Sequence, residues 1–504
     1  MGRRRVRKII LIEPAAPERH AQSLFPLPRL GLPVIGALLK RRGYEVRIYC
    51  EPIAPIDWED VLSADLVGIS TTTCTAPRAY TIAQKVRERG IPVVLGGVHA
   101  TFMPEEALTF GNFVVRGEGE EVFPKLVECV EEGVEPQGVE GVSWMDKSGA
   151  IRHNPQARFV EDLDSLPFPD MSLIVGWGKP LRSGPAWIRL ARSRLPDPLV
   201  ASRGCPWNCR FCTVTKFFGR TYRFRSPESV IEEIKARRLR KIFFYDDNFV
   251  AVREWAAEVA ERILKEGLKV RFSAQMRADV AVKDRELLTL LRRAGLYLVY
   301  VGLEAVDPET LREYRKGYSI EEVEESLRTF HEMGIRVHGM FVFGADSDTP
   351  ETPLRMAEFA LRNGVQTIQI SVLTPLPGSD YYIELDREGR IFTKNWALYD
   401  GLHAVFIPKN MTPFELQVKA IEGYKRFYSP KEVIKSALKL HVLVASFREI
   451  GRRAILGLER ANAEFLRCLK IASDAAGRGI EGIKEAWRRA AREAKLEGGE
   501  LWAT

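Results

Sequence analysis

Three scarcities in this 504-residue chain limit what the protein can be. No apolar run approaches the roughly 18 residues that a membrane-spanning helix needs. The chain has 7 cysteines, and those outside one cluster stand alone: Cys50, Cys74, Cys129 and Cys468. Such spacing does not predict a disulfide framework and indicates a reducing compartment. We therefore expect a cytoplasmic protein that is not integral to a membrane.

Strong charge of one sign is also missing. Lys and Arg number 75 against 67 Asp and Glu, which gives a formal net charge of +8. No concentrated basic and aromatic module accompanies this excess, so we expect no nucleic-acid partner. An anionic small molecule, a membrane surface or thermal adaptation explains the charge equally well. The length, with 45% hydrophobic residues, predicts two or three folded domains.

The chain is organised around a cysteine loop at residues 201–212. Its cysteines are separated by three and then by two residues: Cys205, Cys209 and Cys212. Three thiolates on one tight loop can hold a four-iron cluster that is one ligand short, and the open iron can bind a substrate. The alternatives are a structural zinc site or cysteines that only fill space. A closed zinc site needs a fourth ligand nearby, yet the next downstream histidines are His331 and His338.

Residues 6–145 alternate between expected strands and helices, which predicts an open, doubly wound parallel sheet of the Rossmann-like kind. Ligands of such sheets lie beyond the carboxyl ends of the strands. Small and polar residues follow those ends here and suit a large flat ligand: Thr71, Thr72, Thr73, Gly96, Gly97, His99, Gly117 and Glu118. The alternative is that the glycines serve only the turns.

Residues 146–196 are rich in Pro, Gly and Asp, and we interpret them as an ordered linker that Trp177 and Trp187 pack down. Residues 197–380 hold about six strand–helix repeats, which predict a partial (β/α)6 barrel with its active site at the strand carboxyl ends. Polar residues fall at those ends: Asp246, Asp247, Asn248, Gln275, Arg277, Glu304, Asp346 and Asp348. Some of them can instead be helix caps.

The cysteine spacing, with Phe211 directly before the last cysteine, resembles the signature of the radical S-adenosylmethionine (SAM) family. The stretches at 96–101 and 117–120 look like the cobalamin-binding domain of cobalamin-dependent radical SAM enzymes. The resemblance implies a [4Fe-4S] cluster on the three cysteines, SAM as its ligand, and cobalamin bound by the N-terminal residues named above. It also implies the following SAM-binding residues: Phe211, Tyr245, Asp247, Asn248, Gln275, Arg277 and Glu304.

One departure from the wider cobalamin-binding pattern concerns the cobalt ligand. The Asp-x-His-x-x-Gly motif that supplies a cobalt-ligating histidine in other cobalamin proteins is absent. His99 belongs to a different motif. We therefore expect His99 to line the pocket of the corrin or its nucleotide tail without ligating cobalt.

The C-terminal region, residues 381–504, resembles the hopanoid-methylase-like and tetraether-ring-synthase-like branch at 396–401 and 406–413. Those relatives act on lipid carbon. From residue 430 the chain is expected to be helical and mixes apolar residues with many Lys and Arg. Such helices can contact an anionic membrane surface peripherally, but we favour a helical hairpin packed on the barrel.

The resemblance implies a function as well. We expect SAM cleavage to a 5'-deoxyadenosyl radical and methylation of an unactivated carbon of a lipid or another small molecule. The alternatives are a radical cyclase, a ring-forming or C–C bond-forming enzyme without methyl transfer, and, more remotely, an RNA-modifying protein. An electron donor such as flavodoxin or ferredoxin is the expected protein partner.

Overall fold

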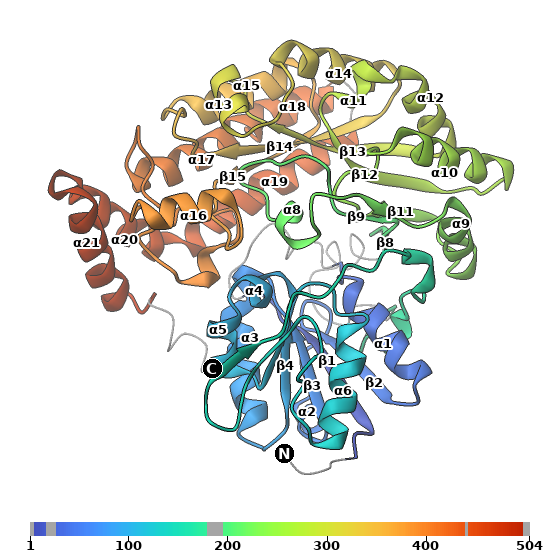
Figure 1. The fold of residues 1–504 in the computed structure, drawn as a ribbon. Helices are drawn as coiled ribbons and strands as arrows, with labels where there is room; N and C mark the ends of the chain where they lie inside the picture. The colour runs from blue at the N-terminus through green and yellow to red at the C-terminus, as the bar shows by residue number, and fades with distance from the viewer. Residues whose placement is uncertain (1–4, 17–26, 179–194, 439–441, 497–504) are drawn as a thin grey trace.

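A computed structural model describes residues 5–16, 27–178, 195–438 and 442–496 of the chain. Two α/β parts face each other, the N-terminal one below and the larger one above, with a helical C-terminal region beside the upper part (Figure 1). Trp187 of the expected linker lies outside the described residues, whereas Trp177 is half-buried and packs against the N-terminal core.

The lower part is a seven-stranded sheet with the strand order β2-β1-β3-β4-β5-β6-β7. Its strands are β1 Lys8–Glu13, β2 Glu45–Cys50, β3 Leu66–Ser70, β4 Val93–Gly96, β5 Phe113–Val115, β6 Val142–Met145 and β7 Ile151–His153. The first five are parallel. Their helices are α1 Gly31–Arg41, α2 Trp58–Leu62, α3 Ala76–Arg87, α4 Gly97–Phe102, α5 Pro104–Phe110 and α6 Val122–Glu132.

Helices cover both faces of this sheet, which explains why the four middle residues of β1, Ile9 to Ile12, are all apolar. Ile9 and Leu11 pack into the core that contains residues of α1 and α6. Ile10 and Ile12 face the opposite way, into the core that contains residues of α3 and α5. A stretch of strand buried on both faces by helices is filled by apolar residues, and the charged Lys8 and Glu13 stand at the two ends of β1.

The sheet differs from the expected parallel one at its far edge. β6 pairs antiparallel with β5, and β7 pairs antiparallel with β6. β7 is exposed along its length and lies in the segment that we interpreted as linker, past residue 145. Its pattern was missed because three exposed residues after a turn give no apolar periodicity.

The upper part is a six-stranded parallel sheet with the order β15-β14-β13-β12-β11-β8. Its strands are β8 Asp197–Leu199, β11 Lys241–Phe244, β12 Arg271–Arg277, β13 Leu296–Glu304, β14 Arg336–Phe343 and β15 Thr367–Val372. The helices between them are α8 Val214–Phe217, α9 Pro227–Ala236, α10 Arg253–Lys265, α11 Val280–Lys283, α12 Arg285–Ala294, α13 Pro308–Glu313, α14 Ile320–Glu332 and α15 Thr352–Arg362.

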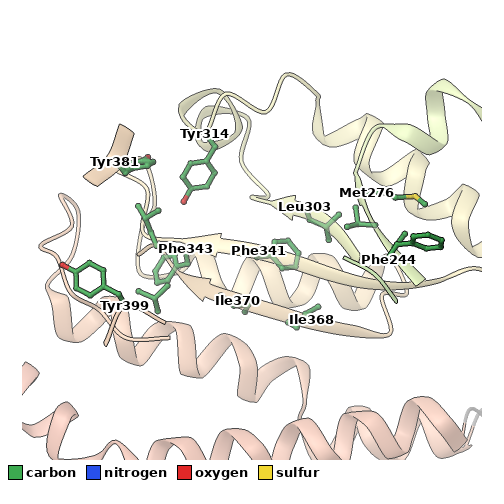
Figure 2. Packing of buried hydrophobic residues seen from close by; sticks show 14 of the residues in the cluster. Phe244, Met276, Leu303, Tyr314, Phe341, Phe343, Ile368, Ile370, Tyr381 and Tyr399 are labelled. Atoms are coloured by element: carbon green, nitrogen blue, oxygen red, sulfur yellow. The ribbon is translucent and has the colours of Figure 1, made fainter. Parts of the chain in front are cut away.

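The helix-facing side of this sheet holds the main apolar core. Leu303, Phe341 and Ile370 come from three neighbouring strands, and each is fully buried (Figure 2). Replacing Phe341 with Ala would cost about 3–5 kcal/mol of stability, because the surrounding side chains cannot fully collapse into the cavity that is left. This core fixes the strands whose carboxyl ends carry the candidate site.

The C-terminal region packs on the edge of the barrel. It contains α16 Asp380–Arg387, α17 Pro413–Phe427, α18 Pro430–Leu438, α19 Val442–Ala461, α20 Ala463–Asp474 and α21 Gly479–Glu493. Tyr424 and Tyr428, at the end of α17, lie along edge strand β15. Their hydroxyl groups accept hydrogen bonds from the backbone N–H groups of Ile370 and Ile368, at 2.8 and 2.9 Å. No helix among the described residues is long and apolar enough to cross a membrane.

Candidate functional site

The cysteine loop is the turn of a short hairpin. β9 Ser202–Arg203 pairs antiparallel with β10 Arg223–Phe224, so all three cysteines lie in the connecting residues 204–222. Gly204 begins the loop with a φ of +88°, and a Cβ atom there would lie 2.4 Å from the carbonyl oxygen of Thr221. Only glycine fits this turn without displacing the backbone.

The three thiols are free and partly accessible. Burial raises the pKa of Cys212 to about 12, and the backbone N–H of Val214 donates to its Sγ at 3.4 Å. Among the described residues, no three His, Cys, Asp or Glu side chains converge on one point as a single-ion site would require. Three cysteines on one loop match the three thiolates that hold a four-iron cluster with one open iron.

Two predicted SAM-binding residues carry buried polar atoms that lack a partner among the described residues. These atoms are Oδ1 of Asn248 and Nη1 of Arg277. Arg277 is otherwise held in place: its Nε donates to Asp279 at 3.1 Å, and its guanidinium lies over the Trp207 ring at 4.4 Å. Unsatisfied buried groups are costly, so their presence marks a position where a polar ligand fits.

Glu304 ends β13 with a left-handed φ of +62° and is buried. Its Oε1 accepts a hydrogen bond from Nζ of Lys316 at 3.0 Å. A Cβ atom at Gly302 would lie 2.4 Å from that oxygen, which explains the glycine. Nζ of Lys316 is also 5.7 Å from the ring centre of Phe211, so the Glu304–Lys316 pair lies against the cysteine loop.

Two consecutive carboxyl groups follow β11. Burial raises the pKa of Asp246 to about 7, and its carboxylate accepts from the hydroxyl of Ser202. Burial also raises the pKa of Asp247 to about 6, which the backbone N–H of Gly204 partly offsets. A buried carboxylate without a cation gains from a positively charged ligand, because the ligand would compensate its charge.

One cavity of about 330 Å³ lies between the two parts of the molecule. The predicted cobalamin residues on its wall are Thr71, Gly96, Gly97, Gly117 and Glu118, and the predicted SAM residues there are Tyr245 and Asp247. A Cβ atom at Gly117, whose φ is +81°, would meet nothing within 4 Å. The cavity therefore brings together two groups of residues that lie 127 to 176 positions apart in the sequence.

Three predicted cobalamin residues are not part of this cavity wall. Thr72 and Thr75 form a reciprocal cap at the start of a 3₁₀ turn, and Thr73 is buried within it. His99 is fully buried in α4, where its Nε2 is 3.5 Å from Glu106 and its ring is 5.1 Å from Trp396. His99 thus packs against the C-terminal region rather than lining the cavity.

The remaining predicted SAM residues lie at the barrel mouth. Gln275 donates to the carbonyl oxygen of Asp246 at 3.3 Å, and Phe211 packs edge-on against Tyr314. The sequence did not single out Lys316, Trp207 or Tyr318, which surround Arg277 and Glu304. The position of Trp207 between the first two cysteines could have marked it as a site residue. Lys316 and Tyr318 follow a short helix, and no sequence pattern marks them.

Comparison with known proteins agrees with both halves of this site. Residues 199–348 match the Radical SAM superfamily, and residues 20–127 match the B12 binding domain. The cobalamin-dependent radical enzyme OxsB, in its structure with aqua-cobalamin and S-adenosylmethionine bound, superposes with a TM-score of 0.66 and 16% identity. That likeness covers 97% of this chain and 80% of OxsB, and it shows the shared fold.

Relatives of similar length extend the match along the chain. An uncharacterized methyltransferase of Pyrococcus horikoshii is 28% identical, over 90% of this chain and 99% of its own. Hopanoid C-3 methylase of Methylococcus capsulatus is 28% identical, over 92% of this chain and 86% of its own. Anaerobic magnesium-protoporphyrin IX monomethyl ester cyclase of Rubrivivax gelatinosus is 28% identical, over 85% of this chain and 78% of its own. The chain therefore combines a match to the Radical SAM superfamily with a match to the B12 binding domain, and it is similar along most of its length to two methyltransferases and a cyclase.

Proposed function

We propose that the protein is a cobalamin-dependent radical SAM methyltransferase that methylates an unactivated carbon of a small molecule, with a lipid as the leading candidate. The observation that carries this proposal is the shared cavity, whose wall includes Gly96 and Gly117 on one side and Tyr245 and Asp247 on the other. Methyl transfer needs the two cofactors within reach of one substrate, and a single cavity between the two domains meets that need.

Cys205, Cys209 and Cys212 would hold a [4Fe-4S] cluster, and Asp247, Asn248, Arg277 and Glu304 would bind SAM. When bound, the cluster supplies the electron for SAM cleavage and cobalamin supplies the methyl group. The orphaned Nη1 of Arg277 suits a carboxylate, and the buried Asp247 suits an ammonium group. SAM carries both groups, which supports this assignment.

Cobalamin would lie against the carboxyl ends of β3, β4 and β5. Gly96, Gly97 and Gly117 let a ligand approach the backbone, and the cavity volume suits a nucleotide-sized group. The buried position of His99 supports the expectation that it does not ligate cobalt. A contact between His99 and the corrin or its nucleotide tail would require α4 to move. We therefore assign His99 a packing role against Trp396.

The substrate would lie against the inner face of the barrel. Gln275, Tyr300, His338 and Thr367 are register neighbours on four adjacent strands, and all are partly accessible. The ring of Tyr300 is 5.1 Å from that of Phe243, which in turn is 4.9 Å from Tyr245 of the shared cavity. This aromatic path gives a substrate with an apolar ring system a continuous surface.

A ring-forming reaction without methyl transfer is the second candidate. The similarity to a magnesium-protoporphyrin ester cyclase, over most of both chains, favours it. The same thiols and the same cavity would serve either reaction. The products of SAM therefore discriminate between the two candidates.

The test is an anaerobic incubation of cluster-reconstituted, cobalamin-loaded protein with SAM, reduced flavodoxin or ferredoxin, and a cell lipid extract. Methylation predicts S-adenosylhomocysteine and 5'-deoxyadenosine together, with a lipid that gains one methyl mass. Ring formation predicts 5'-deoxyadenosine with a lipid that loses hydrogen mass. Product formation without SAM consumption would contradict both, and Cys209→Ala is the inactive control.

Peripheral membrane contact is a further part of this proposal. Ile434 and Leu438 of α18 and Phe447 of α19 are exposed, and the nearby Lys431 and Lys435 are exposed as well. Apolar side chains beside basic ones suit an anionic bilayer surface. Co-sedimentation with anionic vesicles would show it, and replacing Leu438 with Ser should reduce it.

A further inference from the structure

Four charged side chains join the N-terminal sheet to the cysteine hairpin. Glu118 and Glu120 come from the loop after β5, whereas Arg203 and Arg223 come from β9 and β10. Arg203 donates to Oε1 of Glu118 at 2.8 Å and to Oε1 of Glu120 at 2.5 Å. Arg223 donates to both carboxylate oxygens of Glu118, at 2.8 and 3.0 Å. We call these four residues the clamp.

Glu118 is the centre of the clamp. Arg203 and Arg223 are direct partners across the hairpin, so two like charges face each other there. The Glu118 side chain, only 3% exposed, lies between them and also accepts the backbone N–H of Val160 at 2.8 Å. Burial alone would raise the pKa of Glu118, but Arg223 and Arg203 hold it below its ordinary value. Removing this carboxylate would leave two guanidinium groups buried and facing each other.

The clamp touches both candidate cofactor sites. On one side, Gly117, Glu118, Glu120 and Arg203 belong to the wall of the shared cavity. On the other side, the paired strands that carry Arg203 and Arg223 form the base of the loop with the three cysteines. Glu118 belongs to the cavity wall and, through its carboxylate, contacts both strands at the base of the cysteine loop, so it is the residue at which the two sites meet.

We propose that the clamp couples the two sites: a ligand in the N-terminal cavity steadies Glu118, and Glu118 steadies the hairpin in its iron-binding shape. The inference rests on the proposed function, since it takes cobalamin as the ligand and a four-iron cluster as the partner. Glu118 is then a positioning residue rather than the cobalamin contact that the sequence indicated. Because coupling between two binding sites is reciprocal, the cluster must strengthen cobalamin binding by the same factor.

The experiment measures the loss of iron from the reconstituted protein under an iron chelator, with and without hydroxocobalamin, by the decay of cluster absorbance under anaerobic conditions. Typical coupling energies correspond to about 5–150-fold, so we expect hydroxocobalamin to slow iron loss from the unaltered protein about 10-fold. Glu118→Gln should lose iron at one rate with or without hydroxocobalamin. The control is Glu121→Gln, an exposed neighbour on the same loop, which should behave like the unaltered protein.

Equal protection by hydroxocobalamin in Glu118→Gln and in the unaltered protein would overturn the proposal. If Glu118→Gln does not fold, Glu120→Gln keeps the test open, because it removes only the second partner of Arg203 and should give intermediate protection. A second measurement needs no variant: hydroxocobalamin affinity must differ between cluster-loaded and cluster-free protein, and equal affinities overturn the coupling. Protein that binds both cofactors independently refutes the clamp alone, whereas protein that binds neither refutes the proposed function as well.

Discussion

The two halves of the site are built by different means. The N-terminal half is shaped by small residues, because Gly96, Gly97 and Gly117 line the cavity wall and a Cβ atom at Gly117 would meet nothing within 4 Å. The barrel half is shaped by charges in mutual contact, such as Lys316 with Glu304. A large ligand with many weak contacts needs shape, whereas a small zwitterion needs a few placed charges. Added volume should therefore harm the first half, and altered charge the second.

The largest effect should come from the cysteines. Cys209→Ala removes one of three cluster ligands, and we expect complete loss of cluster iron and visible cluster absorbance. Cobalamin should still bind, although more weakly if the clamp couples the sites. Iron content and cobalamin stoichiometry measured on the same sample check this. A variant that keeps a full cluster would contradict the assignment of the thiols.

The next largest effect should come from charge at the barrel mouth. Arg277→Met removes the guanidinium whose Nη1 lacks a partner among the described residues, and we expect SAM affinity to fall about 100-fold, the equivalent of about 3 kcal/mol. Equilibrium dialysis of cluster-loaded protein with SAM measures it. Arg271→Gln, at the exposed start of the same strand, is the control and should keep its affinity. Equal SAM affinities in the Arg277 and Arg271 variants would contradict the assignment of Arg277 to the SAM site.

Added volume in the N-terminal half should have a smaller effect. At Gly97, with a φ of +88°, a Cβ atom would lie 2.4 Å from the carbonyl oxygen of Thr71. Gly97→Ala should therefore reshape the loop and reduce cobalamin retention about 10-fold, or roughly 1.4 kcal/mol. Gly90→Ala has a similar φ of +71° but open space around it, so it should strain the chain without affecting cobalamin. Gel filtration with bound cobalamin as the readout separates the two.

The last effect is on stability rather than on cofactor binding, and it concerns the protonation of His338 on the barrel face. Burial lowers the pKa of His338 to about 4, and its Nδ1 lies 2.8 Å from the hydroxyl of Thr367. Between pH 6.5 and 4 the unfolded chain binds this proton and the folded chain does not, so stability falls as the pH falls. His338→Gln should remove about 1–3 kcal/mol of that dependence. The free energy of unfolding in urea, measured on cluster-free protein at pH 7 and pH 5, gives this dependence. A variant with the same pH dependence as the unaltered protein would contradict a His338 that stays neutral in the folded chain.

The sequence predicted those parts of the site that are local in the chain. The cysteine spacing, the apolar strands and the glycine turns can each be recognised from a few consecutive residues. Contacts between distant segments had no such signal: Glu118 and Arg203 are 85 positions apart, and Lys316 meets Glu304 across a short helix. The contact of His99 with Trp396 had no local signal either, because Trp396 lies almost 300 residues further along the chain.

Tyr424 of α17 and Tyr428, the residue directly after this helix, give the C-terminal region a role that its composition does not suggest. An edge strand exposes backbone groups that can recruit another chain, and proteins need some way to block that. Here Tyr424 and Tyr428 offer their hydroxyls to β15 as a neighbouring strand would offer its carbonyls. A chain cut before Pro413 would leave β15 uncovered, and its molecules would join edge to edge. The helical tail thus covers the open edge of the barrel sheet.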